Sequence, residues 1–152
     1  MALRDQFTTA LKESMKAGDQ RRVSTVRLIL AALKERDIDA RGKGNPKGIE
    51  DTEIQRMLQG MVKQRHEAIA LYKQGNRPEL ARQEQEEIAV IETFLPKQMS
   101  DADAEAAIKQ VIAAVGAASV KDMGKVMGAL KEKYSGQLDL AKAGGIVKKL
   151  LG

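Results

Sequence analysis

Apolar residues recur along this chain at spacings of three and four, and the two-residue alternation typical of strands is nearly absent. Glycine and proline interrupt this helical pattern several times, which predicts seven helices. The predicted breaks are Gly18-Asp19, residues 42–48, Gly75-Asn76, Leu95-Pro96, Gly116 and Gly136. The pattern therefore predicts an all-α protein.

The break at Pro96 divides the predicted helices into two groups, because a proline disfavours helix at the residue before it. Residues 1–95 form a four-helix N-terminal domain, in which the short joint at Gly75-Asn76 makes the third and fourth helices an antiparallel hairpin. Residues 96–152 form a three-helix bundle. Predicted N-caps are Asp51 or Thr52 for the third helix, Ser100 with Asp103, Ser119 with Asp122, and Asp139.

Composition limits the class of protein. The 152 residues include no cysteine, which excludes disulfides and thiolate metal sites, and only 3% aromatics, so the core is aliphatic. The N-terminal residues lack an apolar segment and no run is long enough to span a membrane, which predicts a cytoplasmic protein without a membrane partner.

The positive charge is unevenly distributed. The chain carries a net charge of +5, yet residues 1–95 hold 17 basic and 15 acidic side chains. Residues 121–152 hold seven lysines against Asp122, Glu132 and Asp139. This distribution favours a polyanionic partner near the C-terminus.

Residues suited to catalysis are sparse. No serine lies in a glycine-rich elbow, and the single histidine, His66, is expected at the surface. We predict no catalytic residue, metal or cofactor. The loop at 42–48 has glycine and lysine but not the order of a phosphate-binding loop. We expect a solvated connector there, with a basic finger that becomes ordered on RNA as the alternative.

Arg65 lies in the middle of the third helix's apolar face, between Met61 and Tyr72. If the chain folds back near residue 76, Arg65 faces Glu87. We therefore predict a structural ion pair between Arg65 and Glu87, with Glu84 as the alternative partner, because an unpaired buried arginine is costly.

Gly124 and Gly128 stand one helical turn apart, away from the apolar face of the sixth helix, and Lys121 and Lys125 flank them. Exposed glycines between lysines would let an RNA backbone approach closely. Close packing against a neighbouring helix is the alternative.

Two further groups of side chains extend the candidate RNA-binding set. Lys142, Gly145 and Lys149 share a face of the last helix, away from its apolar residues. Arg27 and Lys34 border the apolar face of the second helix and would assist.

Four stretches, residues 22–34, 62–65, 94–98 and 121–128, resemble the YqeY family, whose fold recurs as the C-terminal tail of the GatB subunit of tRNA-dependent amidotransferases. The Asp-Met-Gly-Lys-Val-Met-Gly run at 122–128 carries most of this resemblance. The resemblance implies an all-helical, two-part fold and recognition of the tRNA body. It also brings the family label of carbon–nitrogen ligase activity with glutamine as amido donor, which we interpret as inherited from full-length GatB.

The residues and the resemblance together favour a non-catalytic tRNA-binding accessory module. A component of a tRNA-dependent amidotransferase and a protein-binding helical adaptor are the alternatives. The expected partners are tRNA and an amidotransferase or another translation component.

Overall fold

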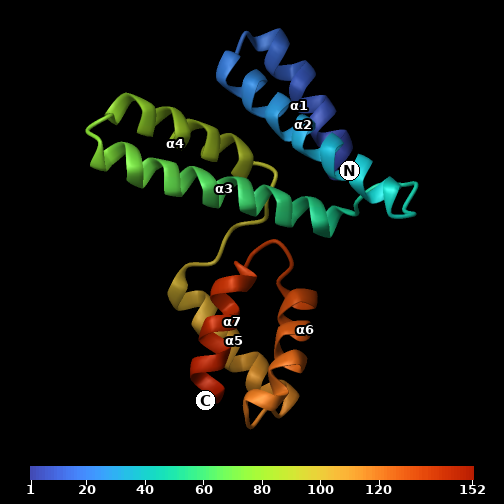
Figure 1. The fold of residues 1–152 in the computed structure, drawn as a ribbon, viewed down its shortest axis with the longest axis vertical. Helices are drawn as coiled ribbons and strands as arrows, with labels where there is room; N and C mark the ends of the chain where they lie inside the picture. The colour runs from blue at the N-terminus through green and yellow to red at the C-terminus, as the bar shows by residue number, and fades with distance from the viewer. The chain divides into compact units, whose positions relative to one another are not determined.

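The computed structural model describes residues 1–152 and confirms the all-α class (Figure 1). Seven α-helices and one 3₁₀ turn make up the chain: α1 (Leu3–Ala17), α2 (Gln20–Gly42), α3 (Asp51–Gln74), α4 (Pro78–Glu92), α5 (Asp101–Val115), η1 (Val120–Asp122), α6 (Met123–Lys133) and α7 (Leu140–Leu151). None of the helices combines the length and apolar character needed to cross a bilayer.

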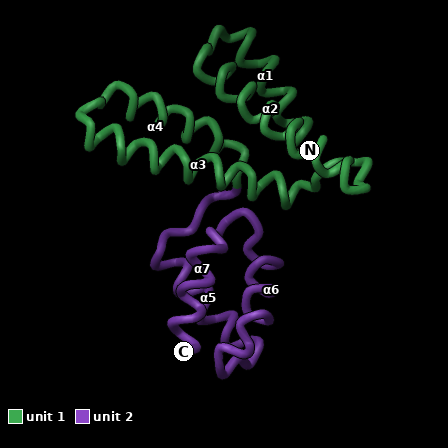
Figure 2. The backbone as a smooth tube through the Cα atoms, in the orientation of Figure 1, with its two compact units in different colours: residues 1–95 green, residues 96–152 purple.

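The chain divides into two compact units, Met1–Leu95 (unit 1) and Pro96–Gly152 (unit 2), coloured separately in Figure 2. In unit 1, α1 pairs with α2, and α3 pairs with α4. Their apolar faces share a core in which the Phe7 and Phe94 rings meet edge to face, 4.9 Å between centroids. A smaller cluster of Ile69, Ala81 and Ile88 closes the far end of the α3–α4 hairpin.

The α3–α4 hairpin contains the ion pair expected from its register. Arg65 Nε donates to Glu87 Oε2 at 2.9 Å, and the two side chains are only 13% and 16% exposed. Glu84 lies farther away, at 4.0 Å from the same nitrogen. Burial, followed by the charge of Glu87, raises the pKa of Glu84. Such a pair fixes how the two helices are aligned more than it adds stability.

Unit 2 is a three-helix bundle with an aliphatic core, formed by Ile108, Val111, Val126, Leu130, Leu138, Ala143 and Val147. Polar side chains start its helices. The Ser100 hydroxyl accepts from the Asp103 N–H at 3.2 Å, and the Asp139 carboxylate accepts from two N–H groups of α7. These bonds satisfy N–H groups that the first turn of a helix leaves free.

Two local predictions were wrong, the N-cap of the third helix and the end of the fourth. The N-cap of α3 is Glu50, whose side chain makes no cap bond, while the Asp51 carboxylate accepts from the Leu3 N–H at 3.4 Å. The predicted Ser119–Asp122 capping box is present, and the 3₁₀ turn η1 that it opens leads directly into α6. The fourth helix ends at Glu92, before Pro96, because residues 93–95 continue as tighter turns that place Phe94 in the core.

Candidate nucleic-acid interface

The outer face of α6 carries the two glycines singled out from the sequence. Val126 and Leu130 point into the core, and Gly124 and Gly128 lie exposed on the opposite side. No heavy atom lies within 4 Å of the place where a Cβ would stand on either glycine. These glycines are therefore open, and the alternative of close packing against a neighbouring helix is not what the structure has.

Lysines border this open surface. Lys121 and Lys125 are both exposed, and Glu132 is an exposed acidic residue one turn beyond Gly128. The Asp122 side chain holds the start of this segment, because it accepts from the Ala118 N–H at 3.0 Å and from the Ser119 N–H at 3.4 Å. These two bonds lower the pKa of Asp122. Lys121 therefore projects from a capped turn, and Lys125 projects from the first turn of α6.

On α7 two successive glycines have different surroundings. Gly144 packs inward, where its Cβ position is 3.6 Å from Met123 Cε and 3.9 Å from Met127 Cε. Gly145 is exposed with open space around it, and Lys142 and Lys149 are exposed on the same outward side. The last helix thus repeats the combination of accessible backbone and lysines found on α6.

Helices α6 and α7 pack against each other in antiparallel directions (Figure 1), so their lysines lie at two different ends of unit 2. Lys121 and Lys149 lie toward one end of unit 2, where Val120 Cγ2 is 3.8 Å from the Cβ position of Gly152. Lys142, in the first turn of α7, lies toward the other end. Helix α5 has a net negative charge, because it carries three acidic residues and one lysine. The positive charge of the bundle therefore lies mainly on α6 and α7.

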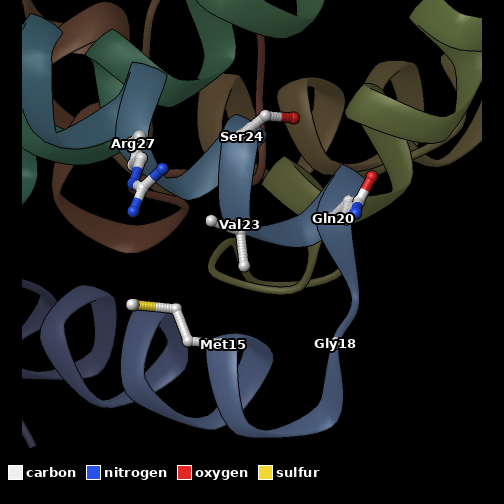
Figure 3. A pocket seen from close by; sticks show the side chains of 6 residues that line it. All are labelled: Met15, Gly18, Gln20, Val23, Ser24 and Arg27. Carbon is white, nitrogen blue, oxygen red and sulfur yellow. The ribbon is translucent and has the colours of Figure 1, made fainter.

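Arg27 and Lys34 are exposed on α2 and so belong to unit 1, the other compact unit. Arg27 also lines an open groove of about 420 Å³ beside the turn between α1 and α2, where Met15 and Arg27 lie at one side (Figure 3). The groove residues are Met15, Gly18, Gln20, Val23, Ser24 and Arg27. Met15 is 54% exposed there.

Sequence reasoning missed a buried cluster at the base of the 42–48 loop. Asp37 is 6% exposed, and both of its carboxylate oxygens accept hydrogen bonds from the Arg4 guanidinium. The Ile49 N–H also donates to Asp37 Oδ1 at 3.0 Å, and Arg4 Nη2 donates to the Ile49 carbonyl at 2.7 Å. We call Arg4, Asp37, Gly48 and Ile49 the clasp.

Residues 42–47 are exposed, as expected of a solvated connector, but the clasp holds the end of this loop in the interior. Gly48 and Ile49 are buried, and Gly48 has a φ of +79°. The sequence did carry one signal, since Asp37 follows Ile29 and Leu33 at intervals of four and so falls on the inward face of α2. An acidic residue at such a position requires a partner.

Taken together, the exposed surface offers ammonium groups and accessible helix backbone, which suit the binding of a polyanion. His66 is exposed on α3, as its sequence context had led us to expect.

Comparison with known proteins places the chain in a family. The model of the Yqey-like protein family matches residues 4–151. The protein named "Altered inheritance of mitochondria protein 41, mitochondrial" of Lachancea thermotolerans is 30% identical over 95 residues, which cover 62% of this chain and 49% of that protein. Its namesake in Vanderwaltozyma polyspora is 29% identical over 85 residues, covering 56% and 44%. The chain thus spans about half the length of these relatives. Because the family model matches nearly the whole length of the chain, the chain belongs to the YqeY family.

Proposed function

We propose that this YqeY-family protein is a non-catalytic RNA-binding module whose ligand is tRNA. The observation that carries the proposal is the outer face of α6, where the open Gly124 and Gly128 lie between exposed lysines. Because glycine has no side chain, nothing at these two positions would hold an RNA backbone away from the helix. Lys121 and Lys125, with Lys142 and Lys149 on α7, supply the cations that neutralise phosphates.

The aromatic residues favour contact with the RNA backbone over the stacking of bases. The chain has two phenylalanines, both buried, and two tyrosines, both partly buried. Sequence-tolerant binding of single strands usually relies on exposed aromatic rings. Recognition of the shape and phosphates of a folded RNA does not require them. A tRNA therefore fits this surface better than an unstructured strand.

Reversing the charge of Lys121 and Lys125 tests the proposal. In fluorescence anisotropy with labelled bulk tRNA, K121E/K125E is expected to bind at least about tenfold more weakly at about 0.1 M salt. The slope of log affinity against log salt is also expected to fall, by about 0.9 for each phosphate that the variant no longer neutralises. The matched control is K63E/K73E, which makes the same charge change at positions of α3 and should retain at least half of the wild-type affinity.

Two results would contradict the proposal. The first is wild-type affinity in K121E/K125E. The second is glutamine- and ATP-dependent transamidation of misacylated tRNA by the purified chain alone, which would favour the amidotransferase alternative. Co-purification with protein and without RNA, judged by the ratio of absorbance at 260 and 280 nm, would support an adaptor role instead.

The glycines give a prediction in which stability and binding change in opposite directions. G124Q/G128Q should raise the free energy of unfolding by about 1 kcal/mol, because glutamine favours helix more than glycine and both sites are open. The same substitution should weaken tRNA binding by blocking close approach. Ala106→Gln, at an exposed position of α5, serves as the steric control and should change neither quantity appreciably. Thermal unfolding and anisotropy measure the two effects, and unchanged affinity in G124Q/G128Q would exclude close approach at these glycines.

The proposed compartment is the cytoplasm, following the sequence-based expectation. The relatives from Lachancea thermotolerans and Vanderwaltozyma polyspora carry the word mitochondrial in their names. Fractionation of cells that express the tagged natural chain would decide between the two compartments.

A further inference from the structure

A row of exposed cations runs along α2 of unit 1, beside the edge of the helix's buried face. Arg27, Lys34 and Arg41 follow one another at intervals of seven residues, so they lie along one face of the helix. All three are exposed. At 1.5 Å per residue, the row extends over about 21 Å. No ion pair engages these three side chains, which leaves them available to an anionic partner.

The acidic residues of α2 do not interrupt this row. Asp37 points inward and is held by Arg4. Glu35 and Asp39 are exposed, but at 100° per residue both fall on the opposite flank of the helix. The exposed charges of the row are therefore all positive, although unit 1 as a whole has nearly balanced charge.

The row leads into a finger, which we define as residues 41–47. Its Lys43 and Lys47 are exposed, and the stretch 40–49 contains no acidic residue. Lys43 Nζ lies 3.1 Å from Asp39 Oδ2, but both side chains are largely exposed, so this pair contributes little and competes weakly with a phosphate. Row and finger together place five cations on one continuous segment.

Hydrogen bonds order the finger without a ligand. The Asn45 N–H donates to the Ala40 carbonyl at 3.0 Å, and the Gly48 N–H donates to the Asn45 carbonyl at 3.2 Å. Gly44 has a φ of +93°, which glycine adopts without strain. At the base, the clasp fixes Gly48 and Ile49 against Asp37. The finger therefore presents its lysines on a defined backbone.

We infer that the cationic row of α2 and its finger form a second RNA-backbone surface, carried by unit 1 and preformed before RNA arrives. This inference rests on the proposed function, because it assigns the same ligand to a second part of the chain. A preformed contact loses less entropy on binding than one that becomes ordered there. Two phosphate-binding surfaces in one chain also raise the overall affinity for a single large RNA.

The side chains of this surface favour a polyanion in water over a membrane or a protein partner. The finger holds no large apolar side chain that could enter a bilayer or fill a protein pocket. Three large apolar side chains are exposed near this surface, and scattered residues of this kind are normal on a protein: Ile38 (58% exposed), Leu28 (46%) and, in the groove with Arg27, Met15 (54%).

The variant K43E/K47E tests the surface in the full-length chain. With labelled bulk tRNA at about 0.1 M salt, we expect about tenfold weaker binding and a salt slope lower by about 1 to 2. Its melting temperature should stay within about 2 °C of wild type, because both lysines are exposed and outside the clasp. K63E/K73E is again the charge-matched control in unit 1.

The outcomes separate this inference from the proposed function. If wild-type protein does not bind tRNA, the proposed function fails and the inference fails with it. If wild type binds and K121E/K125E weakens binding, but K43E/K47E and R27E/K34E bind as wild type does, only the inference is overturned.

Hydrogen exchange of the free protein tests whether the finger is preformed. The Asn45, Gly48 and Ile49 amides should exchange at least about tenfold more slowly than an unstructured chain in the absence of RNA. Unprotected amides in the free protein that become protected only with tRNA would overturn preformation and would show a finger that orders on RNA.

Discussion

Replacing Asp37 by alanine is expected to lower the free energy of unfolding by about 3 kcal/mol. The substitution leaves the Arg4 guanidinium without its carboxylate and the buried Ile49 N–H without its acceptor. Removing one partner of a buried pair costs more than the pair contributes, because the remaining polar groups stay desolvated. The Arg4 side chain is 35% exposed, which places the expected cost at the lower end of the range for such pairs.

Urea denaturation followed by circular dichroism measures this decrease in stability. Asp39→Ala is the matched control, since Asp39 lies two residues away on α2 and only makes an exposed pair with Lys43. Asp39→Ala should lower the free energy of unfolding by less than about 0.5 kcal/mol. Equal decreases in the two variants would show that the clasp contributes no more than a surface pair.

The clasp also predicts a dependence of stability on pH. The hydrogen bond from Arg4 is the main cause that lowers the pKa of Asp37 below the usual range of an aspartate. A carboxyl whose folded-state pKa is depressed stabilises the fold above its unfolded-state pKa, and that contribution is lost as pH falls through the folded-state value. The stability difference between wild type and D37N should therefore be constant above about pH 5 and shrink in more acidic solution. A difference that stays independent of pH down to about pH 2 would contradict the ionised clasp.

Replacing Gly48 by alanine is expected to cost about as much as removing the Asp37 carboxylate, near 3 kcal/mol. A Cβ at this position would stand 2.7 Å from Asp37 Cγ and 3.1 Å from Arg4 Nη2, both too close for an unaltered clasp. The φ of +79° adds backbone strain, because residues with a side chain rarely adopt it. The loop must then move away from α2, and the finger loses its base.

Gly44→Ala isolates the backbone contribution in the same loop. Gly44 also has a positive φ, of +93°, but nothing lies within 4 Å of its Cβ position. Gly44→Ala should lower the free energy of unfolding by about 1 kcal/mol, through backbone strain alone. Urea titrations of both variants give the difference, and amide exchange at Ile49 should accelerate in G48A only. Equal costs for G44A and G48A would show that the clash with Asp37 is relieved without consequence.

Much of the fold could be predicted from the sequence because its signals are local. Apolar spacing of three and four, the glycines at helix ends and the serine and aspartate caps each act within a few residues. The short turn at Gly75-Asn76 set the register of the third and fourth helices closely enough to pair Arg65 with Glu87 across 22 positions. Family membership also followed from short stretches of sequence, and the family match over residues 4–151 supports it.

The clasp could not be predicted because its members come from three separate segments. Arg4, Asp37 and Ile49 stand up to 45 positions apart, and nothing near each residue specifies the others. The same distance in sequence hid the reason for Gly48, which looked like one more flexible loop glycine. Its close contact with Asp37 exists only after α1, α2 and the loop have packed together.

The sequence by itself determined the helices, most of their ends and which side of each helix is apolar, because backbone propensity and hydrophobic periodicity act over a few residues. Only the tertiary structure decided which glycines are open and which are enclosed. Gly144 and Gly145 are adjacent in sequence, yet one meets two methionine side chains and the other meets solvent. That difference depends on where a neighbouring helix lies, and so it arises from packing between segments that are distant along the chain.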